Sequence, residues 1–227
     1  MTIIVNGSNT PTAGAVGYGD GTNLAFTSAG TTGQFLQSNG SSAPSWVGAP
    51  ASAMTLISTQ TASNSASLSW TGLTADKYML TFEYAYPSVT SASFLGVQFG
   101  VGATPTYNTS SYRSYTNIQY NGGGVGSFAS YYVSNGSLIY ISADSYNSSS
   151  YAQNGSVILQ SLTYNSTVSP PSVIGLSGGL AYTEGGNCVT NSWGADRNYN
   201  SPVTAIKVLF SSGNIVSGTF SLYSIAS

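Results

Sequence analysis

The sequence predicts an all-β protein in which an N-terminal extended arm or short shaft precedes an antiparallel, jelly-roll-like β-sandwich. Three observations support this fold class. Apolar and polar residues alternate in many short runs, and pairs such as Asn-Gly separate these runs. No window places apolar residues at the i, i+3, i+4, i+7 spacing of an amphipathic helix. The spacing of the runs indicates about eight strands in the sandwich.

Residues 1–50 differ in composition from the rest of the chain. Apolar residues are sparse there, and glycine and alanine are frequent. Such a segment cannot by itself bury enough apolar surface to offset its conformational entropy. We therefore expect residues 1–50 to form an attachment and oligomerisation arm and residues 51–227 to form the sandwich. Pro44, Gly48 and Pro50 mark the linker between them.

One motif stands out within the arm. The pattern predicts a short strand, a turn at Asn39-Gly40 and a returning strand that ends in an anchoring tryptophan. A hairpin this small lacks a core, so its apolar side chains are expected to pack against copies from other chains. The alternative is a local hairpin packed on its own domain. The motif residues are Gly33, Gln34, Phe35, Leu36, Ser38, Asn39, Gly40, Pro44 and Trp46.

The sandwich strands are predicted from alternating or continuous apolar runs. In the second run the alternation places Tyr84 on the same buried face as Tyr78 and Phe82. Asn-Gly pairs at 121–122, 135–136 and 154–155 lie between runs and predict hairpin turns. The runs, in chain order, are 66–71, 78–84, 95–101, 127–133, 138–142, 156–162, 173–176 and 180–182.

The chain closes with two further runs, 203–210 and 219–225, which we interpret as a late strand pair. Gly213 and Gly218 lie between them and tolerate the positive φ that a reversal or bulge requires. The second wall of the core must then come from the earlier strands. The residues expected on the buried face of this pair are Ile206, Val208, Phe210, Phe220 and Leu222.

Two of these stretches resemble a known family. The motif in the arm is similar to the Gly-Gln-x-Leu-x-Ser-Asn-Gly-x-x-x-Pro-x-Trp element of tail-fibre and other surface proteins of tailed bacteriophages. The closing stretch TAIKVLFSSGNIVSGTFSLYSI resembles the end of β-sandwich domains in their virion proteins, with Ser224 where the family usually has glycine. Residues 67–88 resemble the early strands of the same sandwiches. In the family, such hairpins build intertwined, usually trimeric, shafts or attachment segments.

The resemblance implies a structural protein on the surface of a tailed-phage particle: a short fibre, knob or decoration located in the virion. Its arm would anchor a homotrimer to other virion proteins of the capsid or tail. The sandwich would project outward and bind host surface glycan. One alternative is a capsid cement or decoration protein that stabilises the shell. A more distant alternative is a polysaccharide-degrading tailspike enzyme.

Charge is unusually scarce. Only 4% of residues are charged, and the formal net charge is -2. This composition gives no electrostatic basis for binding nucleic acid. The first residues include no basic segment of the kind that begins a signal peptide, and no apolar stretch reaches the length of a membrane span. We therefore expect neither a nucleic-acid nor a membrane partner.

The sequence offers little catalytic chemistry, and we expect no enzyme activity, cofactor or metal. Histidine is absent, which excludes the commonest general base. The best enzymatic hypothesis pairs Glu184 with Asp196 across a loop that carries Trp193. Residues 196–200 imitate the start of a calcium loop but lack its glycine, so we interpret Asp196 as part of a solvated polar loop. Cys188 is expected to be a buried, inert thiol.

The Tyr-rich tract 107–120 allows two interpretations, which extend to Tyr131, Tyr132, Tyr146, Tyr151 and Tyr164. Tyrosine gives large amphipathic contacts at low entropic cost, as in antibody paratopes, which favours a binding surface. Alternatively, the tyrosines cap sandwich edges and subunit interfaces. The candidate surface-binding residues are Tyr112, Tyr115, Trp193 and Tyr199.

Overall fold

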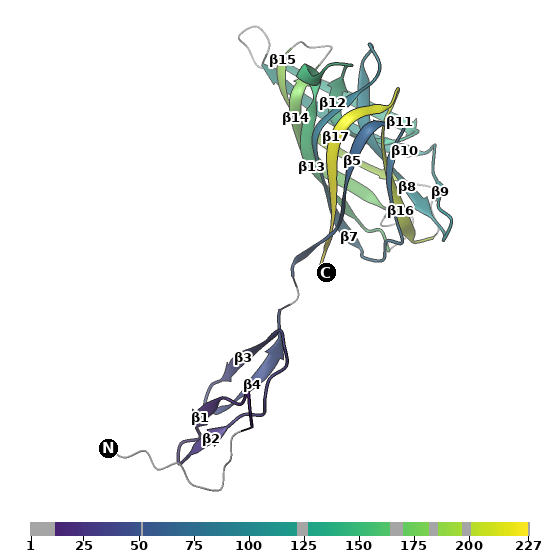
Figure 1. Ribbon diagram of the computed structural model, residues 1–227. Helices are drawn as coiled ribbons and strands as arrows, with labels where there is room; N and C mark the ends of the chain where they lie inside the picture. The colour runs from purple at the N-terminus through teal and green to yellow at the C-terminus, as the bar shows by residue number, and fades with distance from the viewer. Residues whose placement is uncertain are drawn as a thin grey trace. The chain divides into compact units, whose positions relative to one another are not determined.

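The computed structural model describes residues 12–50, 52–121, 127–163, 170–181, 186–196 and 201–226. The chain divides into two compact units, residues 1–52 and residues 53–227. The division lies two residues beyond the boundary expected at residue 50. Figure 1 shows the strands of both units.

The described part of the N-terminal unit consists of two antiparallel hairpins. Strand β1 (Gly17–Gly19) pairs with β2 (Leu24–Phe26), and β3 (Gln34–Asn39) pairs with β4 (Ser42–Gly48). The predicted turn is present, because Gly40 adopts a φ of 68° between β3 and β4. The Asn39 side-chain amide donates to the carbonyl of Ala43 at 2.7 Å, which ties the turn to the returning strand.

Trp46 on β4 is anchored within this unit. Its indole N–H donates to the carbonyl of Ser28 at 2.8 Å and lies 3.2 Å from the Thr27 hydroxyl. A Cβ on Gly30 would lie only 2.6 Å from the indole ring, so the ring packs directly on the Gly30 backbone. Trp46 therefore packs locally, as the alternative interpretation expects.

The second unit is an antiparallel β-sandwich, which confirms the predicted fold class. One 3₁₀ turn, η1 (Ser149–Tyr151), interrupts the strands. The strands are β5 (Met54–Ser65), β6 (Leu68–Thr71), β7 (Lys77–Pro87), β8 (Ser93–Val101), β9 (Thr106–Tyr107), β10 (Tyr112–Asn121), β11 (Ser127–Gly136), β12 (Ile139–Ser145), β13 (Gln153–Gln160), β14 (Ser172–Ala181), β15 (Gly186–Asp196), β16 (Val203–Phe210) and β17 (Ile215–Ile225).

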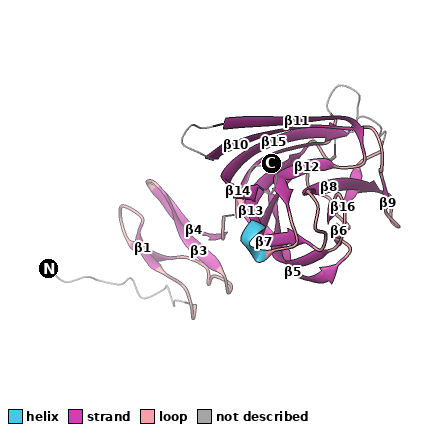
Figure 2. Cartoon of the chain, turned by 90° about the horizontal axis from the view of Figure 1, so that it is seen from above, coloured by secondary structure: helices cyan, strands magenta, loops and turns pink. Residues whose placement is uncertain are grey.

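In the described part of the chain, these strands form an eight-stranded and a five-stranded sheet. The larger sheet has the order β11-β10-β15-β14-β13-β7-β17-β5. The smaller has the order β12-β8-β16-β6, with β9 beside β8. Figure 2 shows β10, β11 and β15 in one layer and β8, β12 and β16 in the other. The expectation of about eight strands was therefore too low.

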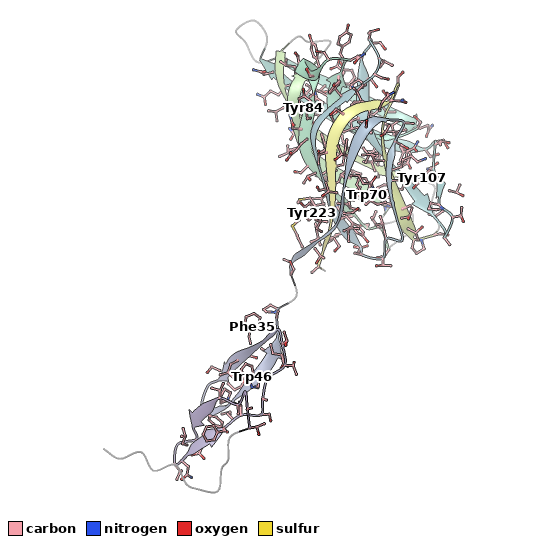
Figure 3. The ribbon with its side chains drawn as sticks, viewed as in Figure 1. Phe35, Trp46, Trp70, Tyr84, Tyr107 and Tyr223 are labelled. Atoms are coloured by element: carbon pink, nitrogen blue, oxygen red, sulfur yellow. The ribbon has the colours of Figure 1, made fainter. Side chains whose placement is uncertain are left out.

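The core lies between the two sheets. Phe82 and Phe220 from the larger sheet are both fully buried, and their rings stack with centroids 6.3 Å apart. Phe99 from the smaller sheet belongs to the same buried cluster. Trp70 lies within the sandwich (Figure 3), and its indole N–H donates to the Ser58 hydroxyl at 2.8 Å. The inner faces predicted from alternation are thus largely present.

The closing strands are buried as predicted but are not paired with each other. Phe220 and Leu222 are fully buried, as are Ile206 and Val208. Yet β16 lies between β8 and β6, whereas β17 lies between β7 and β5 in the other sheet. The prediction that the two closing strands pair with each other was therefore wrong. The connection crosses from one sheet to the other, and Gly213 adopts the expected positive φ, 78°, within it.

The Asn154-Gly155 pair is not a hairpin turn, because it lies inside β13. The Asn154 side chain accepts the backbone N–H of Tyr84 at 2.8 Å, and Tyr84 has a φ of 56°. The β13–β7 register shifts at this point, which identifies a β-bulge. The bulge also explains why Tyr84 is 51% exposed rather than buried, since the extra residue reverses the alternation and buries Ala85 instead.

The other Asn-Gly predictions had different outcomes. Asn135 and Gly136 lie inside β11, where the β10–β11 register shifts, so the φ of 60° at Asn135 belongs to a β-bulge and the predicted hairpin turn was wrong. The turn predicted at 121–122 extends beyond the described residues.

The runs 173–176 and 180–182 join in one strand, β14, of which residues 172–181 are described.

Candidate binding surface on the eight-stranded sheet

Strand β10 separates the Tyr-rich tract into an inner and an outer face. Tyr112, Ser114 and Thr116 are buried, whereas Arg113 and Gln119 are exposed. Tyr115 shares the outer face and is half-buried. A strand with period 2 therefore divides the tract, because alternate residues face the core and the surface.

Tyr112 is a core residue, so its prediction as a surface-binding residue was wrong. Its side chain is fully buried, and its hydroxyl accepts the backbone N–H of Phe99 at 2.7 Å. The two rings lie 6.3 Å apart. A buried tyrosine of this kind fixes the ends of the two sheets, since its hydroxyl needs a partner in the interior.

Residues 186–196 were expected to belong to a loop, but they form strand β15. Burial alternates along its side chains from residue 187 onward, with Trp193 exposed and Ser192 and Gly194 buried. Trp193 lies directly opposite Tyr115 on the neighbouring strand β10. Their ring centroids are 4.4 Å apart with an interplanar angle of 34°. Two predicted surface residues are therefore brought together as one aromatic pair.

The pair belongs to a row of large side chains that crosses the whole sheet. Each residue is the direct cross-strand partner of the next, so all lie on one face. None is in the buried class, and Trp193 is 46% exposed, Tyr132 63% and Ile174 54%. Tyr223 of this row is labelled in Figure 3. The apolar row comprises Tyr132, Tyr115, Trp193, Ile174, Ile158, Met79, Tyr223 and Leu56.

A hydroxyl- and amide-rich row runs along one side of the apolar row. It lies two residues away on every strand except β5, where a shift in register makes the separation three residues. Asn117 accepts the Ser130 hydroxyl at 2.7 Å within it. The hydroxyls of Ser221 and Thr59 also lie 2.7 Å apart. The polar row comprises Ser130, Asn117, Asn191, Leu176, Ser156, Thr81, Ser221 and Thr59, with Leu176 its one large apolar member.

A cavity of about 590 Å³ opens on this face at the aromatic end of the apolar row. Tyr115, Tyr132, Trp193 and Ile174 line it. The lining on the other side of the cavity consists of the short side chains of Ser172 and Ala195 and the longer side chain of Arg113. The volume falls within the range of small-ligand sites, and aromatic walls with a few polar groups are typical of such sites.

Arg113 is the cation of this cavity. It lies two residues from Tyr115 on the same face of β10, opposite Ala195 on β15 and Ser134 on β11. No hydrogen bond or ion pair joins its guanidinium to another described residue. The short neighbouring side chains leave the guanidinium open to a ligand.

The remaining candidate residues have different positions. Tyr199 and Glu184 lie outside the described residues. Asp196 is buried, and its carboxylate accepts the Asn108 side-chain amide at 2.8 Å, so its interpretation as solvated was wrong. Buried between the sheets, it does not face the cavity that Trp193 lines. Among the described residues there is no cluster of three or more potential metal-ligating side chains.

Cys188 is buried, as expected, against Ile118 and Ala143. Burial raises the pKa of its thiol above the ordinary value, which keeps the sulfur protonated and unreactive.

A second exposed apolar surface lies on the N-terminal unit. Phe35 is 59% exposed and Leu36 is 40% exposed. Phe35, Leu36, Val47 and Pro50 border a shallow site at the open end of the β3–β4 hairpin. Figure 3 shows Phe35 and Trp46 within this unit. Of the assembly motif, Trp46 thus packs locally, while Phe35 and Leu36 remain available to other chains.

The sequence analysis named Tyr132 with the Tyr-rich tract but missed Arg113 and Ile174 as parts of the cavity. Each was visible as a polar or apolar residue in an alternating run, but the cavity depends on which strands are neighbours. The pairing of Tyr115 with Trp193 joins β10 to β15, two strands that are distant in chain order. No local signal carries that information.

Comparisons with protein-family models, with curated proteins and with solved structures gave no match. Within the described part of the chain, no helix has the length and apolar character needed to cross a membrane.

Proposed function

We propose that this chain is a structural protein on the surface of a tailed-phage particle and that the outer face of its eight-stranded sheet binds saccharide on the host surface. The observation that carries the binding role is the apolar row, with the 590 Å³ cavity at its aromatic end. The phage setting rests on the resemblance of residues 33–47 and 203–225 to virion surface proteins.

A saccharide suits this surface chemically. A pyranose ring has an apolar face of C–H groups and a rim of hydroxyls. Aromatic rings such as Trp193 and Tyr115 stack on the apolar face, while neighbouring amides and hydroxyls bond to the rim. The polar row beside the apolar row supplies such groups, among them Asn117 and Asn191.

In this proposal the N-terminal unit attaches the protein to the particle and joins copies of the chain, with a homotrimer as the expected assembly. Phe35 and Leu36 carry this role because both are large, apolar and exposed. Burying each of them is worth about 1.5–3 kcal/mol. An isolated chain has no described contact that provides this burial.

The protein acts by binding rather than catalysis. Histidine is absent from the sequence, and the carboxylate of Asp196 accepts a hydrogen bond in the interior. Among the described residues, the outer face near the cavity presents a guanidinium and aromatic rings, which hold a ligand but supply no acid–base pair.

The location is tested by labelling purified particles with an antibody against residues 53–227 and imaging them. Label on the particle surface supports the proposal, and the label's position separates a tail fibre from a capsid decoration. Purified particles without this chain would refute the virion assignment.

The binding role is tested by adsorption of the protein to host cells. We expect Trp193→Ala to reduce adsorption at least tenfold, because it removes the ring that pairs with Tyr115. Tyr107→Ala on the five-stranded sheet is the matched control, because Tyr107 does not line the cavity, and this variant should adsorb normally. Equal adsorption of both variants would contradict the assignment of this face.

A further inference from the structure

We propose that the saccharide recognised by this surface is acidic and that Arg113 binds its carboxylate. This inference rests on the proposed saccharide-binding role and narrows it to one class of ligand. It follows from the positions of the few charged residues, since only four lysines and arginines exist in the whole chain.

The position of Arg113 suits ligand binding rather than stabilisation of the fold. Its side chain is exposed, lines the cavity beside Tyr115 and Trp193, and makes no ion pair with a described residue. A chain that uses almost no charge elsewhere thus places one of its four cations at the aromatic end of the apolar row. A planar guanidinium matches a carboxylate in bidentate geometry, which Trp193 and Tyr115 cannot supply.

A second cation lies on the same side of the apolar row. Lys77 is two residues before Met79 on β7, as Arg113 is two residues before Tyr115 on β10, and these two strands run in the same direction. They are four strand spacings apart, which is about 19 Å along the sheet. The exposed acid of β7, Glu83, lies on the opposite side of the row.

Asp76 precedes Lys77 in the chain, and its carboxylate accepts the backbone N–H and the hydroxyl of Thr163, at 3.1 Å and 2.7 Å. No ion pair joins Lys77 to a described residue. A linear acidic saccharide lying along the row would therefore meet Arg113 at one end and Lys77 further along.

Other described cations do not share this arrangement. Lys207 lies on the five-stranded sheet, with its ammonium 3.7 Å from the centre of the Tyr107 ring. The ammonium group of Lys207 is therefore already engaged by a side chain of the protein itself. Lys207 therefore provides a control with the same change in net charge at a different surface.

The test uses a panel of hexuronate and sialate oligosaccharides, each paired with its carboxyl-reduced, neutral derivative, and full-length protein. We expect at least one acidic member to bind, and its reduced derivative to bind at least tenfold more weakly. Arg113→Gln should lose a similar factor, Arg113→Lys should retain part of the affinity, and Lys207→Gln should bind normally. Binding of the acidic member should weaken in 0.5 M salt, on the general ground of charge screening.

Several outcomes would overturn the inference. If the reduced derivatives bind as well as the acids, or if Arg113→Gln and Lys207→Gln behave alike, Arg113 does not select a carboxylate, although the saccharide-binding role survives. If no member of the panel, acidic or neutral, binds, then both the inference and the binding role fail. If Arg113→Gln changes the oligomeric state of the protein, the face is an interface between copies.

Discussion

The rings of Tyr115 and Trp193 lie 4.4 Å apart on adjacent strands of the eight-stranded sheet, on its outer face. Aromatic pairs in globular proteins usually contribute to a core, whereas this pair is open to solvent and borders a cavity. The two residues are 78 positions apart in the chain. Only the β10–β15 pairing brings them together.

The loss of stability on substituting Trp193 or Trp70 should differ, because Trp193 lies on the surface and Trp70 in the core. Trp193→Ala should lower the free energy of unfolding by about 0.5–1.5 kcal/mol, the value of one aromatic pair. Trp70→Ala should lower it by about 3–5 kcal/mol, because Trp70 is 4% exposed and its indole N–H bonds to Ser58. Urea unfolding of both variants measures this. Equal losses would contradict the placement of Trp193 on the surface.

Adjacent residues of β17 should differ in the same way. Phe220 is fully buried and stacks with Phe82, so Phe220→Ala should cost about 3–5 kcal/mol, a large share of a typical stability of about 5–15 kcal/mol. Thr219 is exposed, so Thr219→Ala should change stability by less than about 0.5 kcal/mol. Thermal unfolding of both variants gives the comparison. A cooperative Phe220→Ala variant as stable as the parent would exclude β17 from the core.

Two glycines of the N-terminal hairpin provide another matched pair. A valine at Gly40 must adopt a φ near 68°, which costs about 1–3 kcal/mol. Gly48 has no positive φ, and a Cβ there meets no atom within 4 Å. We therefore expect Gly40→Val, but not Gly48→Val, to increase amide hydrogen exchange in residues 34–48. Unfolding of the sandwich should be unchanged in both variants. A less stable sandwich in Gly40→Val would place the hairpin within the sandwich core.

Cys188 gives a prediction about pH. Burial raises the pKa of its thiol in the folded protein, so folding favours the protonated form. This contribution to stability is complete below the thiol pKa of the unfolded chain, and it is lost as the pH rises through the higher folded-state pKa. At pH 8 a disulfide reagent should label the native protein at least about tenfold more slowly than the urea-unfolded chain. Equal rates in a folded sample would contradict the burial of Cys188.

The elements that local patterns encode were predicted well. The buried face of Ile206 and Val208, the burial of Phe220 and Leu222, and the turn at Asn39-Gly40 all follow from alternation or from glycine's tolerance of positive φ. These features depend on residues close in the chain. The all-β fold class follows from the same patterns, repeated along the sequence.

The pairing of strands could not be predicted from the sequence. Alternation cannot tell whether the closing runs pair with each other or cross between sheets, and Asn154-Gly155 has the same composition in a bulge as in a turn. Tyr112 and Tyr115 have the same side chain, and only the strand phase decides which one is buried. The apolar row depends on seven cross-strand registers at once, so it is absent from any single stretch of sequence.

Saccharide binding by the outer face of the eight-stranded sheet can be observed residue by residue. The experiment is amide chemical-shift mapping of isotope-labelled protein, titrated with polysaccharide isolated from the host surface. We predict the largest shifts on β10, β11, β14 and β15, at Tyr115, Tyr132, Ile174 and Trp193 and at Arg113 beside them. Shifts confined to the five-stranded sheet or to the N-terminal unit, or no shifts at saturating polysaccharide, would contradict it.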